Sequence, residues 1–502
     1  MKRKKAGLRN FFHRMDLIIA NSLGRTQSGR LTIHSPSRWS ETVMEPDRHF
    51  SYYPFFLASL SALMKRETKL TVKMMDGCLE KLSSDQYLAK ILSVRPAFLF
   101  METDSTLYRE NLQLALAIKR KAGTRLLFGG PHVTHDPERA LSDGIDYVFT
   151  GEYEGAVLSF FKSKKYLGTE RIFYSDYSIP FSRYPWPEDE DVSRMDYAVP
   201  GEPSSQYREI QMYASRGCVG QCPFCVAKNI YYRKSGHRCR ALHDVADEMA
   251  HLKKKYPQVE GFFFDEEDHF GNADFIESFC SELIRRRSGF KIEALGRFNS
   301  IRTQWLPLLK KAGYYQIRIG IESLHPEIQR AIGKIIDAEK LESFLLLCRK
   351  TGINVYGTFQ VGLPSSTREK DLFTLSCIKK YLVLGWLSHV QVSIFTPLPG
   401  TPVFLQLKQK GYLATELFED YNGGEKSVVN WPDYPSHDIN RTYLDFLNIR
   451  DHVQLWMRFR TGEAWTWFYR KCRTQSLYNL GKKIKRRIYS EARYFLGRKK
   501  NQ

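Results

Sequence analysis

The sequence lacks any apolar run long enough to cross a membrane. The longest, Phe55 to Met64, is about half of the roughly 20 residues that a spanning helix needs. It also lacks a secretory signal, because Arg14 and Asp16 interrupt the apolar stretch behind the basic start. Nine cysteines in 502 residues, three of them clustered, do not look like a disulfide framework. These absences favour a cytoplasmic protein of two or three domains.

Acidic residues are scarce at the ends of the chain. The formal net charge is +21, and Glu491 is the only acid between Arg470 and Lys500. Apolar residues recur there at helical spacing, from Leu480 to Leu496. A basic amphipathic helix can lie on an anionic membrane or on nucleic acid, but a solvated helix or a frayed tail explains the same pattern. Peripheral membrane contact through the basic ends therefore stays an open alternative.

Three cysteines fall within one short loop, Ser215-Arg216-Gly217-Cys218-Val219-Gly220-Gln221-Cys222-Pro223-Phe224-Cys225. Thiolates suit zinc and iron–sulfur clusters, and both kinds of structural site normally take four protein ligands. Three thiolates on a four-iron cube leave one iron open for another ligand. A zinc site remains an alternative if His237 or Cys239 supplies the fourth ligand.

The spacing Cys-x3-Cys-x2-Cys, with an aromatic before the last cysteine, resembles the signature of the radical S-adenosylmethionine (SAM) enzymes. The resemblance implies that Cys218, Cys222 and Cys225 hold a [4Fe-4S] cluster. It further implies that the open iron binds the amino and carboxylate groups of SAM. One electron then cleaves the sulfonium and gives a 5′-deoxyadenosyl radical that takes a hydrogen atom from a substrate.

Strand and helix patterns alternate from Leu31 to about Lys165, which predicts a parallel sheet with helices on both faces. Gly-Gly-Pro-His at 129–132 and Gly-Glu-x-Glu at 151–154 resemble the cobalamin-binding domain of one radical SAM subgroup, as does Pro36-Ser37-Arg38-Trp39. Ligands bind beyond the carboxyl ends of such strands. The candidate cobalamin residues at those ends are Asp76, Gly129, Gly130, Gly151 and Glu152.

One departure from the cobalamin pattern concerns the cobalt ligand. Some cobalamin proteins carry Asp-x-His-x-x-Gly, and this chain reads Asp76-Gly77-Cys78 at the matching place. The subgroup often lacks that histidine, so the domain either binds cobalamin without a lower protein ligand or has lost the cofactor. We expect His132 and His135 to be loop residues and not cobalt ligands.

A second series of six strand–helix repeats runs from Glu209 to about Pro402. Six repeats are too few for an eight-stranded barrel, and the resemblance implies a partial (β/α)6 barrel with its chemistry at the carboxyl ends of the strands. The residues that the resemblance assigns to SAM at those ends are Asp265, Glu266, Arg297 and Glu322. An N-cap role remains an alternative for Asp265.

The predicted fold class is α/β: a doubly wound parallel sheet, then a partial radical SAM barrel and a mostly helical C-terminal region. We expect a basic segment (1–30), a cobalamin-binding-type domain (31–180), an extended surface linker (181–203), the core (204–402) and a basic C-terminal region (403–502). In the last region Trp431, Trp456, Trp465 and Trp467 either form core or line a substrate pocket.

The predicted function is reductive cleavage of SAM, with cobalamin-dependent methyl transfer to an unactivated carbon or phosphorus centre. A cobalamin-free or non-methylating radical SAM enzyme, acting by cyclisation, rearrangement or lipid modification, is the alternative. A non-catalytic iron–sulfur or zinc protein that binds nucleic acid is the alternative of another class. We expect a small-molecule or lipid-like substrate and an external electron donor such as flavodoxin or ferredoxin, and we do not expect nucleic acid as a partner.

Overall fold

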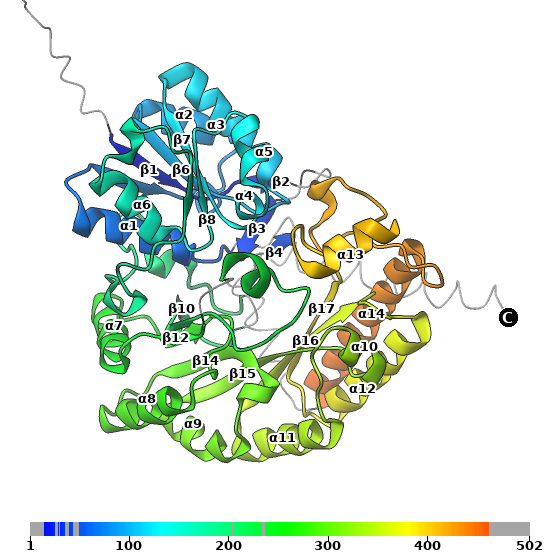
Figure 1. The fold of residues 1–502 in the computed structure, drawn as a ribbon. Helices are drawn as coiled ribbons and strands as arrows, with labels where there is room; N and C mark the ends of the chain where they lie inside the picture. The colour runs from blue at the N-terminus through cyan, green and yellow to red at the C-terminus, as the bar shows by residue number, and fades with distance from the viewer. Residues whose placement is uncertain are drawn as a thin grey trace, which may run out of the picture.

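The structure is a computed structural model, and it describes residues 15–25, 29, 31–35, 40–43, 50–202, 205–232 and 236–460 (Figure 1). Several sequence predictions lie outside these residues: the basic start, the segment 36–39, the basic tail, Trp465 and Trp467. The side chain of Trp456 is outside them as well. Within the residues described, no helix is both long and apolar enough to cross a membrane.

The first domain is a six-stranded parallel sheet in the order β5-β1-β6-β7-β8-β9. Its strands in chain order are β1 (Leu17–Ala20), β5 (Val72–Met75), β6 (Phe98–Glu102), β7 (Arg125–Gly129), β8 (Tyr147–Thr150) and β9 (Ile172–Tyr174). The helices are α1 (Phe55–Glu67), α2 (Ser84–Ser93), α3 (Tyr108–Ala122), α4 (Pro131–His135), α5 (Pro137–Ser142) and α6 (Glu154–Lys162). A small antiparallel sheet, β2 (Gly24–Arg25), β3 (Leu31–Ser35) and β4 (Ser40–Val43), lies beside it.

Alternate residues of each strand pack on opposite faces of this sheet. Leu17 and Ile19 of β1 join the apolar cluster formed with α1 and α6. Ile18 and Ala20 join the cluster formed with α2 and α3. The two-residue period of a strand produces this split, and it confirms the doubly wound sheet that the sequence predicts.

The sequence analysis missed strand β1, although β1 lies inside the sheet between β5 and β6. Its four residues follow directly on the basic start of the chain, and four apolar residues give too short a pattern to identify a strand. The first sheet therefore begins at Leu17, within the segment expected to precede the domain. The domain limits given above remain predictions.

The second domain is a parallel sheet of six strands in sequential order, β10-β13-β14-β15-β16-β17. The strands are β10 (Glu209–Met212), β13 (Gly261–Phe264), β14 (Lys291–Arg297), β15 (Tyr314–Glu322), β16 (Asn354–Val361) and β17 (His389–Ile394). Sequential order curves the sheet into the half-barrel seen in Figure 1, which confirms the predicted partial barrel. A two-stranded sheet, β11 (Ser215–Arg216) with β12 (Arg238–Cys239), carries the cysteine loop.

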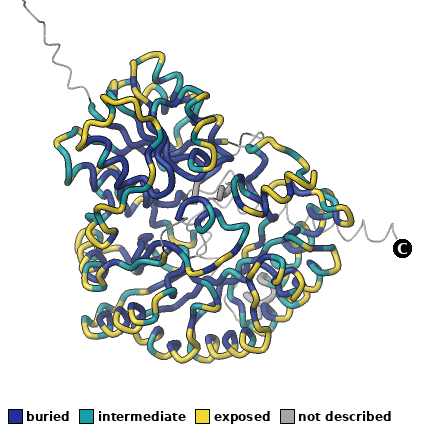
Figure 2. Tube along the Cα trace, viewed as in Figure 1, coloured by how far each residue is buried: buried dark blue, intermediate teal, exposed yellow. Residues whose placement is uncertain are grey.

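Helices cover the outer face of the half-barrel and continue into the C-terminal region. They are α7 (Leu242–Lys255), α8 (Ala273–Arg285), α9 (Leu306–Ala312), α10 (Pro326–Ala331), α11 (Ala338–Thr351), α12 (Arg368–Val383), α13 (Pro402–Lys410) and α14 (Ser436–Arg460). In Figure 2 the strands of both sheets are buried and the helices are exposed on their outer sides. Ile317, Ile319 and Ile321 of β15 pack outward against this helical layer.

The inner face of the half-barrel is polar by contrast. In β16 and β17 the odd or even positions that avoid the apolar layer are Thr358, Gln360, Gln391 and Ser393. Thr358 pairs in register with Gln391, and Gln360 pairs with Ser393. A Cβ on Gly320 would come within 3.6 Å of Thr358 Oγ1, so the Thr358 side chain lies on the same side as the end of β15.

The segment between the two sheets does not lie over the surface, as the sequence led us to expect. Glu188 and Arg194 are 3% and 2% exposed. Glu188 accepts a hydrogen bond from Ser61 Oγ (2.6 Å) and pairs with Lys65 Nζ (2.6 Å). The prediction was wrong because a run of acidic residues suggests solvent, whereas here the acids have buried partners on α1.

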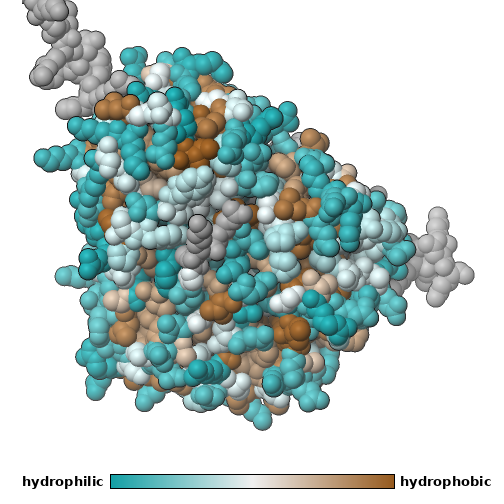
Figure 3. Space-filling model, in the orientation of Figure 1, coloured by the Kyte–Doolittle hydropathy of each residue, from teal (hydrophilic) through white to brown (hydrophobic). Residues whose placement is uncertain are grey.

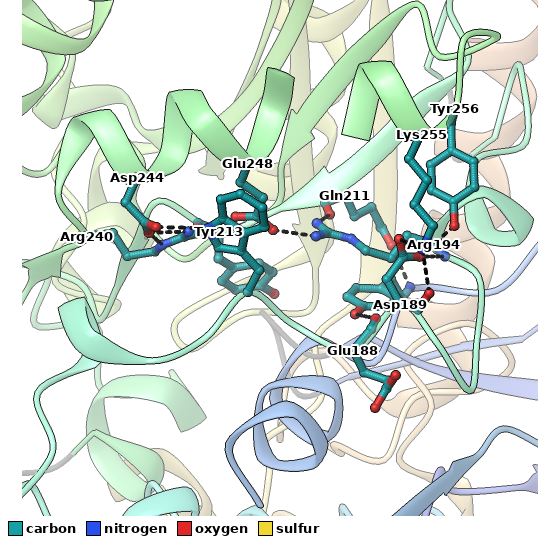
Figure 4. Close-up of polar contacts among 12 residues, drawn as sticks. Glu188, Asp189, Arg194, Gln211, Tyr213, Arg240, Asp244, Glu248, Lys255 and Tyr256 are labelled. Carbon is teal, nitrogen blue, oxygen red and sulfur yellow. Dashed lines mark hydrogen bonds and ion pairs between the residues drawn. The ribbon is translucent and has the colours of Figure 1, made fainter. Parts of the chain in front are cut away.

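Figure 4 shows how Arg194 anchors this segment to the core. Its guanidinium pairs with Glu248 of α7 and donates to the Gln211 carbonyl (2.8 Å). Glu248 is shared with Arg240 (2.5 Å), which also binds Asp244. Removing one member of a buried ion group leaves an uncompensated charge, so the network holds the segment firmly on the start of the half-barrel.

The face of the molecule seen in Figure 3 is hydrophilic over most of its area, with apolar side chains in separate patches. Among the large apolar residues described, the most exposed are Leu167 (73%), Tyr174 (71%) and Ile335 (64%). They come from different elements of the fold.

Candidate active site

The three cysteines lie in the loop that follows β11, beyond the carboxyl end of β10. None of the cysteines that the structure describes is in a disulfide. Gly217 has φ +86°, and a Cβ there would lie 2.7 Å from the Gly236 carbonyl oxygen, so only glycine fits where the loop begins. The Gly220 N–H donates to Cys218 Sγ (3.2 Å). The loop thus turns back on its own first thiol.

Burial disfavours the charged form of these thiols in the metal-free chain. It raises the pKa of Cys218 to about 12 and that of Cys225 to about 11. Burial also raises the pKa of Cys222, against the lowering effect of the nearby Lys334 and Arg297 cations. Thiolates in such surroundings need positive charge beside them, and iron supplies it when it replaces the protons.

Arg297 ends β14 and lies directly against the cysteine loop. A Cβ on Gly220 would come within 2.9 Å of Arg297 Nε. The backbone N–H of Arg297 donates to Asp268 Oδ1 (3.1 Å), but its buried Nε has no hydrogen-bond partner among the residues described. A buried guanidinium nitrogen left without an acceptor indicates a missing anionic or polar ligand. The residues present therefore fit a cofactor that brings a carboxylate.

Glu322 is the last residue of β15 and has φ +65°, which is rare for a residue other than glycine. Lys334 Nζ pairs with Glu322 Oε1 (2.9 Å), and Gln360 Nε2 donates to Oε2 (3.1 Å). Backbone strain of this kind is kept where the surroundings enforce it, often at functional sites. The pair brings a buried cation to the side of Cys222.

Four consecutive acids follow β13, and each has a partner. Gln211 Nε2 donates to Asp265 Oδ2 (3.3 Å). Glu266 accepts from Ser215 N–H (3.1 Å) and Ser215 Oγ (3.0 Å), from the Ala214 N–H and from His269 Nδ1. Both oxygens of Glu266 are therefore used within the chain.

The next two acids also hold the start of the cysteine loop. Glu267 accepts from the Gly217 N–H (3.2 Å) and from the Tyr232 hydroxyl (3.1 Å), and burial raises its pKa to about 8. Asp268 accepts from Ser300 Oγ (2.7 Å) as well as from Arg297.

Sequence reasoning missed Lys334, Glu267 and Asp268. Only Glu267 and Asp268 had a signal, because they continue the acidic run at the end of a predicted strand. Nothing near Lys334 in the sequence distinguishes it from other surface lysines, and folding alone brings it to Cys222.

The zinc alternative required His237 or Cys239 as a fourth ligand. His237 Nε2 instead lies 2.9 Å from the Asp268 carbonyl oxygen, and its Nδ1 lies 3.9 Å from Cys239 Sγ. In the part of the chain that the structure describes, no three His, Cys, Asp or Glu side chains are grouped so as to hold a single metal ion.

The five candidate cobalamin residues lie at the carboxyl ends of β5, β7 and β8. Asp76 accepts from Asn21 Nδ2 (3.0 Å), Tyr197 OH (2.7 Å), and the N–H groups of Cys78 (2.9 Å) and Leu79 (3.0 Å). Glu152 accepts two bonds from Arg238 Nη2 (2.8 and 2.7 Å). These contacts occupy both carboxylates.

The candidate glycines are required by close packing. A Cβ on Gly129 would lie 2.7 Å from the Tyr153 ring, and one on Gly130 (φ +102°) would lie 2.5 Å from the Thr103 carbonyl oxygen. Gly151 (φ +67°) similarly approaches Ser175 Oγ (2.4 Å). A corrin at this edge would therefore contact backbone and neutral side chains.

His132 does not project as a ligand. Its Nδ1 lies 3.0 Å from Ser105 Oγ, and its ring packs on Tyr108 at 4.0 Å between centroids. Burial lowers the pKa of His132 to about 4, so the ring is neutral near pH 7.

The ends of the last two strands close the site from the other side. Gly362, after β16, donates to Asp371 Oδ2 (2.9 Å) and accepts from Trp431 Nε1 (3.0 Å), so Trp431 packs into the structure. Gly400, after β17, packs against the first domain, because a Cβ there would lie 2.6 Å from His135 Nδ1. The two domains thus meet around the cysteine loop.

The model of the Radical SAM superfamily matches residues 212–375. An uncharacterized methyltransferase of Pyrococcus horikoshii is 26% identical over 386 residues, which is 73% of this chain and 81% of that protein.

Two solved structures share the fold. One is the radical SAM methyltransferase TsrM from Kitasatospora setae, with cobalamin and a [4Fe-4S] cluster bound: TM-score 0.60, 15% identity, 80% of this chain and 76% of that chain covered. The other is the cobalamin-dependent SAM radical enzyme OxsB: TM-score 0.63, 13% identity, 89% and 67% covered. The chain therefore belongs to the radical SAM superfamily, in the subgroup that has a cobalamin-binding-type domain before the radical SAM core.

Proposed function

We propose that this protein reductively cleaves SAM and transfers a methyl group to a small molecule with the help of cobalamin. The observation that carries the proposal is one arrangement: three free thiols at the carboxyl end of a half-barrel, beside a buried arginine nitrogen that lacks an acceptor. The family match, the methyltransferase relative and the shared fold support it.

In this proposal Cys218, Cys222 and Cys225 hold a [4Fe-4S] cluster. When bound, the cluster supplies the electron that splits the sulfonium of SAM. Arg297 pairs its free Nε with the methionine carboxylate, and its contact with Gly220 sets its distance from the loop. Glu322, held by Lys334 and Gln360, presents a fixed carboxylate to the cofactor.

Asp265 and Glu266 take different roles. Glu266 has both oxygens engaged with the start of the loop, so we assign it to holding the loop and not to contacting SAM. Asp265 accepts one long bond from Gln211 (3.3 Å), which leaves it better able to accept from the SAM ammonium.

Cobalamin is proposed at the carboxyl edge of the first sheet, which faces the cysteine loop. Asp76 and Glu152 are engaged within the chain, so the backbone near Gly129, Gly130 and Gly151 is the surface offered to the ring. No histidine stands near Asp76 to bind cobalt from below. When bound, cobalamin supplies the methyl group to be transferred.

The substrate is proposed to be a polar small molecule. The inner face of β16 and β17 offers hydroxyl and amide groups from Thr358, Gln360, Gln391 and Ser393. Such a surface favours a ligand with hydrogen-bonding groups over a lipid tail. An external electron donor, of the flavodoxin or ferredoxin kind, would reduce the cluster.

Anaerobic reconstitution with iron, sulfide and cobalamin tests the proposal. We expect about four irons and four sulfides per chain, corrin absorbance that stays with the protein, and 5′-deoxyadenosine from SAM under a strong reductant. Cys222→Ala should lose iron and SAM cleavage, whereas Cys377→Ala, a half-buried thiol on α12, should keep both.

The possible results separate the alternatives. Zinc without sulfide would point to a non-catalytic metal protein. SAM cleavage without retained corrin would leave a radical SAM enzyme of a non-methylating kind.

A further inference from the structure

Arg216 immediately precedes Gly217 and Cys218, yet its side chain leaves the core domain. The residue is 1% exposed, and its Nη2 pairs with Glu154 Oε1 at 2.7 Å. Its Nη1 lies 3.4 Å from Glu152 Oε1. Both acids come from the β8–α6 corner of the first domain, so one arginine joins the cysteine loop to the other domain.

Aromatic rings enclose this guanidinium. Its central carbon lies 4.8 Å from the centre of the Phe56 ring and 4.5 Å from that of Phe181. Phe55 and Tyr184 lie at 5.7 and 5.5 Å. Rings exclude water and present their negative faces to the cation, so the ion pair with Glu154 is unscreened.

The second strand of the cysteine hairpin is held by the same corner. Arg238 in β12 pairs in register with Arg216 in β11. Arg238 Nη2 donates to both oxygens of Glu152. Glu152 thus contacts both strands of the hairpin from which the cysteine loop projects.

Neighbouring residues of the loop are held by the core instead. Ser215 donates to Glu266 and Gly217 donates to Glu267, both beyond the end of β13. Successive residues 215, 216 and 217 are therefore fixed by the core, the first domain and the core again. The loop keeps its position only while the two domains stay docked.

We propose that Glu152 and Glu154 are a clamp on Arg216 and Arg238 that positions the cysteine loop, and that they are not contacts for a corrin. Arg216 is a positioning residue, since it acts through Gly217 and Cys218 and touches no reacting atom. The inference rests on the proposed function only in assigning a cluster to this loop.

Hydrogen exchange of the metal-free chain tests the clamp without any cofactor. Glu154→Gln and Arg216→Lys should each speed exchange of amides 213–226 at least tenfold, while peptides from α11 and β16, far from the clamp, keep the wild-type rate. Glu80→Gln, which removes an exposed ion pair with Lys90 in the same domain, should change nothing. Wild-type exchange in the loop, or a uniform rise over the whole chain, would overturn the clamp.

A second arm follows the two cofactors. Glu154→Gln should lose at least half of the iron and sulfide bound after reconstitution and broaden the electron paramagnetic resonance signal of the reduced cluster. Corrin bound per chain should stay at the wild-type value. Loss of corrin with full retention of the cluster would assign the motif to cobalamin and overturn the proposal.

A double variant distinguishes a clamp from two separate effects. Glu154→Gln with Arg216→Gln should lose no more cluster than Arg216→Gln alone, because both changes break one contact. Additive losses would count against the clamp. If the wild-type chain itself held no cluster, the proposed function would fail, while the exchange experiment would still decide whether Arg216 is clamped.

Discussion

Lys334 and Glu322 form a buried ion pair beside Cys222, although twelve residues separate them in sequence (Nζ to Oε1, 2.9 Å). Gly320 has no side chain where a Cβ would lie 2.7 Å from both charged atoms. The pair therefore depends on a glycine in the strand, a strained backbone at Glu322 and the turn after α10.

Replacing Lys334 tests whether this pair stabilises the fold. Lys334→Met leaves the Glu322 carboxylate buried without its cation, and we expect the free energy of unfolding to fall by about 3–5 kcal/mol. The matched change Lys380→Met removes an exposed pair with Glu342 and should cost less than about 1 kcal/mol. Urea unfolding followed by circular dichroism measures both, and equal losses would contradict the prediction.

Arg297 should matter for SAM but not for the cluster. Arg297→Gln removes a charge-assisted contact worth about 1.5–3 kcal/mol, so we expect SAM to bind the reconstituted protein about 10–100-fold more weakly. Iron and sulfide content should not change. Arg302→Gln, an exposed arginine next to Glu277, is the control. Equilibrium dialysis with labelled SAM gives the affinities, and unchanged binding would remove Arg297 from the site.

Asp371 makes stability depend on pH. Burial raises its pKa to about 6, although it accepts bonds from Gly362, Ser366 and Tyr434. The folded chain therefore keeps this proton at pH values where the unfolded chain has lost it, so the free energy of unfolding falls as pH rises from about 4 to about 6. Two pKa units correspond to about 3 kcal/mol.

Asp371→Asn removes this titration. The stability of the wild type relative to Asp371→Asn should decrease over the same pH range and then stay level. Asp445→Asn, the same chemical change at a partly exposed residue of α14, should follow the wild-type curve. Unfolding at four pH values between 4.5 and 7.5 measures the difference, and parallel curves for all three proteins would refute the assignment.

Gly130 should tolerate no side chain. Gly130→Ala combines φ +102° with a contact of 2.5 Å to the Thr103 carbonyl oxygen, and we expect a loss of about 3 kcal/mol. Gly123→Ala has φ +67° but nothing within 4 Å, so about 1 kcal/mol is expected. Thermal unfolding compares the two, and similar losses would show that space at Gly130 is not limiting.

The order of elements was predictable because each has a local pattern. The helix predicted at 108–122 matches α3, and the strand predicted at 261–264 matches β13. Strand β1 was missed because four residues carry too little pattern. The spacing of the cysteines was equally visible, since the loop that carries them is continuous in sequence.

The partners of each charge were not predictable. Glu152 and Glu154 were assigned to a corrin, yet Arg216 and Arg238 from the other domain lie against them. The acidic segment 185–191 was expected in solvent, yet Glu188 is buried on α1.

The sequence by itself determined the two parallel sheets and the three-cysteine loop, because periodicity and close spacing are local properties of a chain. Only the tertiary structure decided which charges meet: Arg297 with Gly220, Lys334 with Glu322, and Arg216 with Glu154. A charge can pair with any opposite charge that folding brings near, and that proximity depends on how whole elements pack.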